Sequence, residues 1–261
     1  MESGKYVFFD IDGTIYDYVT GIPDSTRDAV RMLKENGHHP IICTGRTRVM
    51  IFDEILELGF DGIVAGCGTY VEWEGKVLYV RELPLEKIIR LVECFRRNGF
   101  AAYPEGNEYF YYDPVYIDDP AGSIYKIYQM KIPGHVRPID YSDMRASKVS
   151  AKYTSRSNVQ AVIDEVSGDY FWTDHKSLFE TVPKDATKGI GVKNLLDHIG
   201  ADREDTYGFG DSFNDLDMLQ LVKHGVVMGN GDEELKKRIP VHTESMLDDG
   251  VYKALKRFGL I

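Results

Sequence analysis

The chain has 261 residues, of which 43% are hydrophobic, and its formal charge is −11 at pH 7. This length suffices for one large domain or two smaller ones. The negative charge argues against nucleic acid or an anionic membrane as a general partner. Three cysteines without a C-x-x-C pair exclude a disulfide framework and predict buried, reduced thiols. Because there is no signal-peptide pattern and no apolar run long enough to cross a bilayer, we expect a cytoplasmic protein.

The first third of the chain alternates between strand and helix patterns. The expected elements, in order, are a strand at 6–9, a helix at 24–36, a strand at 39–43, a helix at 49–58 and a strand at 62–65. Such β-α-β alternation predicts a parallel sheet with helices on both faces.

The character of the sequence changes near residue 83. We expect a helix at 85–97, an aromatic-rich stretch at 100–113 around a Glu-Gly-Asn turn, an irregular stretch at 122–143, a strand at 149–154, a helix at 158–166 and strands at 170–173 and 178–182. Hairpin-like strand pairs predict an antiparallel sheet with helices on one face.

The α/β pattern returns near residue 187. The expected elements are a helix at 190–199, a strand at 206–209, a helix at 216–222, a strand at 225–228 and helices at 233–238 and 251–258. The simplest account is a Rossmann-like parallel-sheet core formed by residues 1–82 and 184–261. A smaller α+β cap domain, residues 83–183, is then inserted into it.

Two acids, Asp10 and Asp12, directly follow the first buried strand, and Gly13 supplies the backbone freedom for a tight turn. Two carboxylates at the mouth of a buried strand are costly unless a cation or a shared proton neutralises them. That cost points to a functional site.

Three more polar clusters fall at predicted strand ends or at a helix start. They are Thr44-Gly45-Arg46, Thr187-Lys188-Gly189 and Gly210-Asp211-Ser212-Phe213-Asn214-Asp215. In an open α/β sheet, ligands bind outside the carboxyl ends of the strands, so these clusters can converge on one crevice. Together they offer oxygen ligands for Mg²⁺, donors for phosphoryl oxygens and a lysine to offset negative charge.

The motifs D-x-D-G-T, T-G-R, a later lysine and G-D-S-x-N-D, in this order, resemble those of the haloacid dehalogenase superfamily. The layout is most similar to the Cof-type phosphatases, which carry a C2-type (IIB) cap between the second and third motifs. The resemblance implies a Mg²⁺-dependent phosphatase that acts on a small phosphorylated metabolite, such as a sugar phosphate.

The resemblance also implies a role for each matching residue. Asp10 matches the nucleophile that becomes an aspartyl-phosphate, and Asp12 matches the general acid and base. Thr14 would orient Asp12, whose backbone carbonyl faces Mg²⁺ in the family. Thr44 and Lys188 complete the implied catalytic set. The implied phosphate- and substrate-binding set is Gly13, Thr14, Thr44, Gly45, Arg46, Lys188 and Asn214, and the implied metal set is Asp10, Asp12, Asp211 and Asp215.

Several alternatives stay open at this level. Lys184 competes with Lys188, and Arg46 could contact substrate or pair with surface acids. Cys67 stands where the family usually has an asparagine, and a thiol is the weaker hydrogen-bonding group. A phosphomutase or a non-catalytic phosphometabolite-binding protein could use the same residues. We expect no nucleic-acid or membrane partner, and a monomer or weak homo-oligomer.

Overall fold

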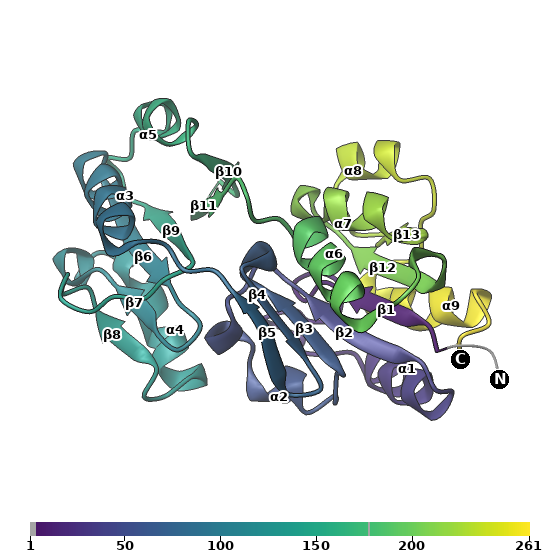
Figure 1. The fold of residues 1–261 in the computed structure, drawn as a ribbon. Coiled ribbons are helices and arrows are strands. Elements are labelled where there is room, and N and C mark those ends of the chain that lie inside the picture. Colours follow the sequence, from purple (N-terminus) through teal and green to yellow (C-terminus); the bar gives the residue numbers. More distant parts are fainter. Residues whose placement is uncertain (1–3, 177) are drawn as a thin grey trace. The chain divides into compact units, whose positions relative to one another are not determined.

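A computed structural model describes residues 4–176 and 178–261, which form two compact units (Figure 1). Among these residues the first unit comprises 4–45, Asp53–Val80 and Thr187–Ile261, and the second comprises Arg46–Phe52, 81–176 and 178–186. The limits that we proposed for core and cap leave residues 46–52, 81–82 and 184–186 in the core, whereas their contacts place them in the second unit. The ring of Phe52 lies 6.3 Å from that of Tyr128, centre to centre. We keep the division into core and inserted cap as a proposal.

The first unit contains a seven-stranded sheet with the order β13-β12-β1-β2-β3-β4-β5. Its strands are β1 (Tyr6–Phe9), β2 (His39–Cys43), β3 (Gly62–Ala65), β4 (Tyr70–Trp73), β5 (Lys76–Val80), β12 (Thr206–Gly210) and β13 (His224–Val227). The five strands from β13 to β3 are parallel, as expected. The antiparallel strands β4 and β5 extend this sheet as a hairpin that was not predicted from the sequence.

Helices cover both faces of this sheet, which confirms the predicted α/β class. The helices are α1 (Asp24–Glu35), α2 (Asp53–Leu56), α6 (Lys188–Ile199), α7 (Leu216–Leu221), α8 (Glu233–Arg238) and α9 (Gly250–Arg257). Phe8, Ile41 and Val64 form one core with residues of α6 and α7. Successive strand residues point to opposite faces, so the buried Val7 and Phe9 point to the face opposite that of Phe8. Figure 1 shows the helices on either side of the sheet.

The predicted helix at 49–58 is wrong in its extent. A 3₁₀ turn, η1 (Arg48–Met50), ends at Ile51, whose extended backbone (φ −83°, ψ 109°) interrupts the helical hydrogen bonds. Only the four residues of α2 are helical after that. Ile51 and Phe52 are both buried, so tertiary packing overrides the local helical pattern.

The second unit contains a six-stranded sheet with the order β10-β11-β9-β6-β7-β8, antiparallel except for the pair β7–β8. Its strands are β6 (Phe100–Glu105), β7 (Phe110–Tyr112), β8 (Val136–Pro138), β9 (Lys148–Tyr153), β10 (Tyr170–Asp174) and β11 (Leu178–Pro183). The unit's helices are α3 (Leu85–Arg97), α4 (Ile124–Lys131) and α5 (Val159–Val166).

Helices α3 and α5 pack on one face of this sheet, around Phe95, Phe100 and Phe179. Helix α4 does not follow the expectation that all helices share one face. Its Tyr128 ring lies 4.4 Å from that of Phe110, centre to centre. Tyr111, the next residue along β7, joins the core under α3 and α5 instead. Since neighbouring strand residues point in opposite directions, α4 lies on the other face.

Short 3₁₀ turns connect several of these elements. Besides η1 they are η2 (Gly66–Gly68), η3 (Pro114–Tyr116), η4 (Pro120–Ser123), η5 (Arg203–Asp205), η6 (Phe213–Asp215) and η7 (Met246–Asp248). No helix in the described part of the chain is both long enough and apolar enough to cross a bilayer.

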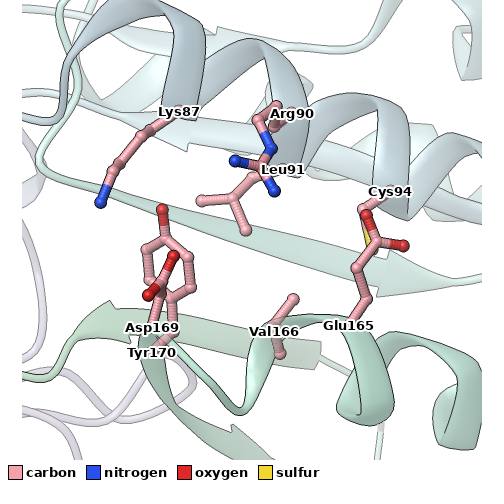
Figure 2. Close-up of a pocket in the computed structure, with 8 residues that line it drawn as sticks. All are labelled: Lys87, Arg90, Leu91, Cys94, Glu165, Val166, Asp169 and Tyr170. Carbon is pink, nitrogen blue, oxygen red and sulfur yellow. The ribbon is translucent and has the colours of Figure 1, made fainter.

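A pocket of about 340 Å³, including space open to solvent, lies between α3 and α5 in the second unit (Figure 2). Its lining residues are Lys87, Arg90, Leu91, Cys94, Glu165, Val166, Asp169 and Tyr170. Two cations and two acids balance each other there, so the charge of the pocket favours no ionic class of ligand.

Candidate active site

Two acid-bearing loops meet at the carboxyl edge of the parallel sheet. The first follows β1 and carries Asp10 and Asp12, and the second follows β12 and carries Asp211 and Asp215. Strand β1 pairs with β12, and the Asp10 amide donates a hydrogen bond to the Phe209 carbonyl at 2.9 Å. Asp10 follows β1 directly and Asp211 follows β12 directly. Because parallel strands end at the same edge, these two residues lie side by side although they are 201 positions apart in the sequence.

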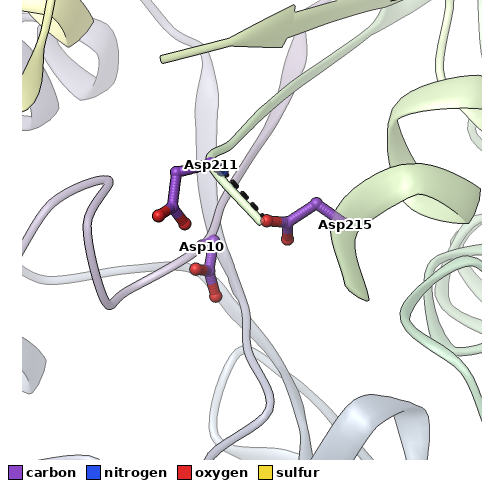
Figure 3. Close-up of side chains that lie close together, drawn as sticks. All are labelled: Asp10, Asp211 and Asp215. Carbon is purple, nitrogen blue, oxygen red and sulfur yellow. Dashed lines mark hydrogen bonds between the residues drawn. The ribbon is translucent and has the colours of Figure 1, made fainter. Parts of the chain in front are cut away.

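Three carboxylates converge at this edge (Figure 3). One oxygen each of Asp10, Asp211 and Asp215 lies within 4.8 Å of the other two. Asp10 and Asp215 are buried, and the buried Oδ1 atom of Asp211 has no hydrogen-bond partner among the described residues. Carboxylate oxygens are the ligands that Mg²⁺ prefers, and an unpartnered buried oxygen is costly. The donor set therefore fits a divalent cation.

Lys188 joins two of these acids. Its Nζ atom lies 2.6 Å from Oδ1 of Asp10 and 2.6 Å from Oδ1 of Asp215, and its side chain is fully buried. Lys188 is the first residue of α6, and the Thr187 hydroxyl caps that helix by accepting from the Ile190 amide. The competing Lys184 is exposed and belongs to the second unit. The fold thus brings Lys188 to the acids.

Asp215 has both carboxylate oxygens engaged. Oδ1 receives Lys188, and Oδ2 accepts hydrogen bonds from the amides of Asp211 and Ser212, each at 3.0 Å. This is a capping box at the start of η6. Asp215 therefore holds Lys188 and the Asp211 loop in place.

The electrostatics of the cluster favour extra positive charge. Burial raises the pKa of Asp10 well above its ordinary range, because Lys188 only partly offsets burial and the neighbouring carboxylates. Burial and the Asp215 carboxylate raise the pKa of Asp211 to about 7. Burial alone would lower the pKa of Lys188, but Asp10 and Asp215 raise it well above its usual value, so the ammonium stays charged. A divalent cation would take the place of the proton that the acids otherwise retain.

Gly13 is required by the geometry of the first loop. Its φ is +78°, in the left-handed region, and a Cβ there would collide with the Asp211 carboxylate. Any other residue would strain the backbone and displace an acid. The Asp-Gly turn thus packs directly against the second acid-bearing loop.

Other residues predicted for this site have different surroundings. Asp12 does not belong to the group of converging carboxylates, and its metal contact through the backbone carbonyl stays a prediction. Thr14 is fully buried, and its hydroxyl makes no hydrogen bond to any described residue. Its orienting role toward Asp12 stays a prediction. The Asn214 side-chain oxygen accepts a hydrogen bond from the Ser212 hydroxyl at 2.8 Å.

The Thr44-Gly45-Arg46 cluster is divided between the two units. Thr44 is buried in the first unit, where its carbonyl accepts from the Cys67 amide at 3.0 Å, and Gly45 follows it there. Arg46 belongs to the second unit. Its buried guanidinium lies 4.5 Å from the ring centre of Phe52 and donates to the Met50 carbonyl.

Cys67 has a left-handed backbone, with φ 54° and ψ 42°, between Gly66 and Gly68, whose φ values are also positive. Asparagine, the usual family residue there, tolerates this conformation better than most side chains. Cysteine adopts this conformation here and offers a weaker hydrogen-bonding group than an asparagine amide would.

Two residues that contact these loops were not predicted from the sequence. The Asn230 side-chain amide donates to the Gly13 carbonyl at 2.8 Å, and Asp217 accepts from the Gly189 amide at 2.8 Å. Asn230 lies in a Met-Gly-Asn-Gly-Asp sequence just after β13, so its position at the end of a parallel strand was an available signal.

Comparison with known proteins agrees with this architecture. Residues 7–255 match the family model of the haloacid dehalogenase-like hydrolases. YkrA of Bacillus subtilis (strain 168) is 30% identical over 274 residues, and the match covers 98% of each protein. From the same organism, 5-amino-6-(5-phospho-D-ribitylamino)uracil phosphatase YitU is 26% identical, with 99% of each protein covered.

Among solved structures, the HAD subclass IIB sugar phosphatase BT4131 matches with a TM-score of 0.84 at 25% identity. The match covers 98% of this chain and 100% of that protein. The chain therefore belongs to the haloacid dehalogenase-like hydrolases and is an enzyme of the phosphatase type found among its relatives.

Proposed function

We propose that the chain is a Mg²⁺-dependent phosphatase that hydrolyses a small phosphorylated metabolite, such as a sugar phosphate, through an aspartyl-phosphate on Asp10. The observation that carries this proposal is the buried Lys188 ammonium held between Asp10 and Asp215, beside the unpartnered oxygen of Asp211. A carboxylate nucleophile needs such a neighbour to stay ionised while buried. YitU and BT4131, which are named for phosphorylated ribityl and sugar substrates, support a polar metabolite.

Asp10 and Asp211 would hold the metal ion, with Asp215 supporting them. Bound Mg²⁺ would supply positive charge that favours ionised Asp10 and offsets the charge of the phosphoryl oxygens. Lys188 adds a second positive charge to the same place, and the described geometry already directs it at Asp10. Positioning and charge stabilisation are what phosphoryl transfer mostly requires.

The proposed reaction has two displacements at phosphorus. In the first, an Asp10 oxygen bonds to phosphorus, the bond to the leaving oxygen breaks, and Asp12 gives that oxygen its proton. In the second, Asp12 takes a proton from water as the water oxygen bonds to phosphorus, and the Asp10–phosphate bond breaks. We assign binding of the phosphoryl group to Gly13, Thr14, Thr44, Gly45 and Asn214, and contact with the rest of the substrate to Arg46.

The test is phosphate release from a panel of phosphorylated metabolites, measured with Mg²⁺ and with EDTA. We expect Asp10→Asn to lower kcat by roughly 10³-fold or more, because the amide cannot act as the nucleophile. Asp28→Asn is the matched control, since Asp28 is exposed on α1 and its ion pair in the described part of the chain is with its neighbour Arg31. Undiminished hydrolysis by Asp10→Asn would refute the mechanism. Transfer of phosphate to a second sugar hydroxyl would instead indicate a phosphomutase.

A further inference from the structure

Asn230 links the first acid-bearing loop to a distant segment of the same unit. It lies in residues 228–232, between β13 and α8. Its Nδ2 atom donates to the Gly13 carbonyl at 2.8 Å, and its Oδ1 atom accepts from the Met246 amide at 2.9 Å. The partners fix the orientation of the amide, because a carbonyl only accepts and an amide N–H only donates.

Residues 228–232 also bond to the second acid-bearing loop. The Asp232 amide donates to the Asp211 carbonyl at 2.7 Å, and the Met228 amide donates to the Gly210 carbonyl at 2.9 Å. Gly13 itself packs against the Asp211 carboxylate so closely that no Cβ fits. One short segment therefore sets the position of both loops that carry the acids.

We propose that Asn230 is a positioning residue for the phosphatase reaction, a role that rests on the proposed function. It holds the Gly13 carbonyl, and thereby fixes the positions of Asp10 and Asp12 relative to Asp211. A displacement of about 1 Å in a catalytic group can cost roughly 10²-fold in rate. Asn230 is exposed, so its hydrogen bonds add little to the stability of the fold.

The test compares Asn230→Ala and Asn230→Asp with Asn36→Ala. Asn36 is a matched control because it is also exposed and donates one side-chain bond, at 2.9 Å, to the distant Leu260 carbonyl. Asn230→Asp retains the acceptor for Met246 and loses the donor to Gly13. We expect both Asn230 variants to lower kcat about tenfold or more with little change in KM, and Asn36→Ala to retain the wild-type kcat.

Hydrogen exchange of the substrate-free protein gives a readout besides activity. Both Asn230 variants should exchange faster than wild type at residues 10–16, where the Gly13 amide bonds to the Tyr16 carbonyl. Their thermal midpoints should match that of Asn36→Ala. A wild-type kcat and wild-type exchange in Asn230→Asp would overturn the proposal. If instead Asp10→Asn kept full activity, the proposed function would fail, and the exchange experiment would still decide whether Asn230 holds the loop.

Discussion

Replacement of Lys188 by methionine tests the electrostatic reasoning most directly. Methionine has nearly the length of lysine but carries no charge, so Lys188→Met leaves Asp10 and Asp215 buried without the ammonium that now lies 2.6 Å from each. Both acids must then be neutralised by protons or by a metal ion.

The expected loss of stability is large. Removal of one partner from a buried ion pair costs about 3–5 kcal/mol. For a chain of this size, about 1 kcal/mol shifts the thermal midpoint by roughly 2–4 °C, so we expect a decrease of roughly 6–20 °C. Loss of a charge that stabilises the transition state should also lower kcat by about 10²–10³-fold.

The loss of stability in Lys188→Met should grow as the pH rises. The folded-state pKa of Lys188 is raised, so its contribution is fully present at neutral pH and disappears only as the pH rises through that value. Without Lys188 the pKa of Asp10 rises further, and so does that of Asp211, which is about 7 in wild type, so the folded variant retains more protons than folded wild type around pH 7 and above. Its stability therefore falls more steeply in this range, and the gap to wild type widens.

Thermal denaturation at about pH 5 and about pH 8, with and without Mg²⁺, measures the difference in thermal midpoint between Lys188→Met and wild type. Lys193→Met is the control on the same helix, because the Lys193–Asp197 pair is exposed, with 63% and 64% of the side-chain surfaces accessible. It should change stability by less than about 0.5 kcal/mol. Equal midpoints for the two variants at about pH 8 would refute the assignment of Lys188 as the cation that stabilises this buried cluster.

Two further substitutions test other parts of the chain. Burial alone would raise the pKa of Glu180, but Lys148 and His175 hold it at about 2. This depressed pKa stabilises the fold above about pH 4.5. Glu180→Gln should therefore lower the free energy of unfolding, measured by urea denaturation, by up to about 3 kcal/mol at pH 7 and by less as the pH falls towards 3. An equal loss at pH 7 and pH 3 would contradict this. Cys67→Val should lower the free energy of unfolding by about 1–2 kcal/mol relative to Cys67→Asn, because a β-branched residue fits the left-handed backbone poorly. Equal thermal midpoints for the two variants would show that the backbone at residue 67 does not strain valine.

Elements with strong periodicity could be predicted from the sequence. Helix α3 has the limits expected from its apolar spacing, and β2 and β3 have those expected from short apolar runs between turn residues. Helix α4 was missed because its apolar residues do not form one clear stripe, as the sequence Ile-Tyr-Lys-Ile-Tyr-Gln-Met-Lys shows. The β4–β5 hairpin was missed. Its turn contains Glu74 and Gly75, which both have the positive φ of a tight hairpin turn.

The sequence alone determined the chemistry of the candidate site, because the acids and the lysine stand directly at strand ends and a helix start, where an α/β sheet exposes them. Only the tertiary structure decided which of them touch. It paired Lys188 with residues 178 and 27 positions away, and it engaged both oxygens of Asp215 while leaving one of Asp211 without a partner. It also brought Asn230 to Gly13 across 217 positions. Such contacts depend on the register of neighbouring strands and on side-chain packing, and neither is encoded in the spacing of one short motif.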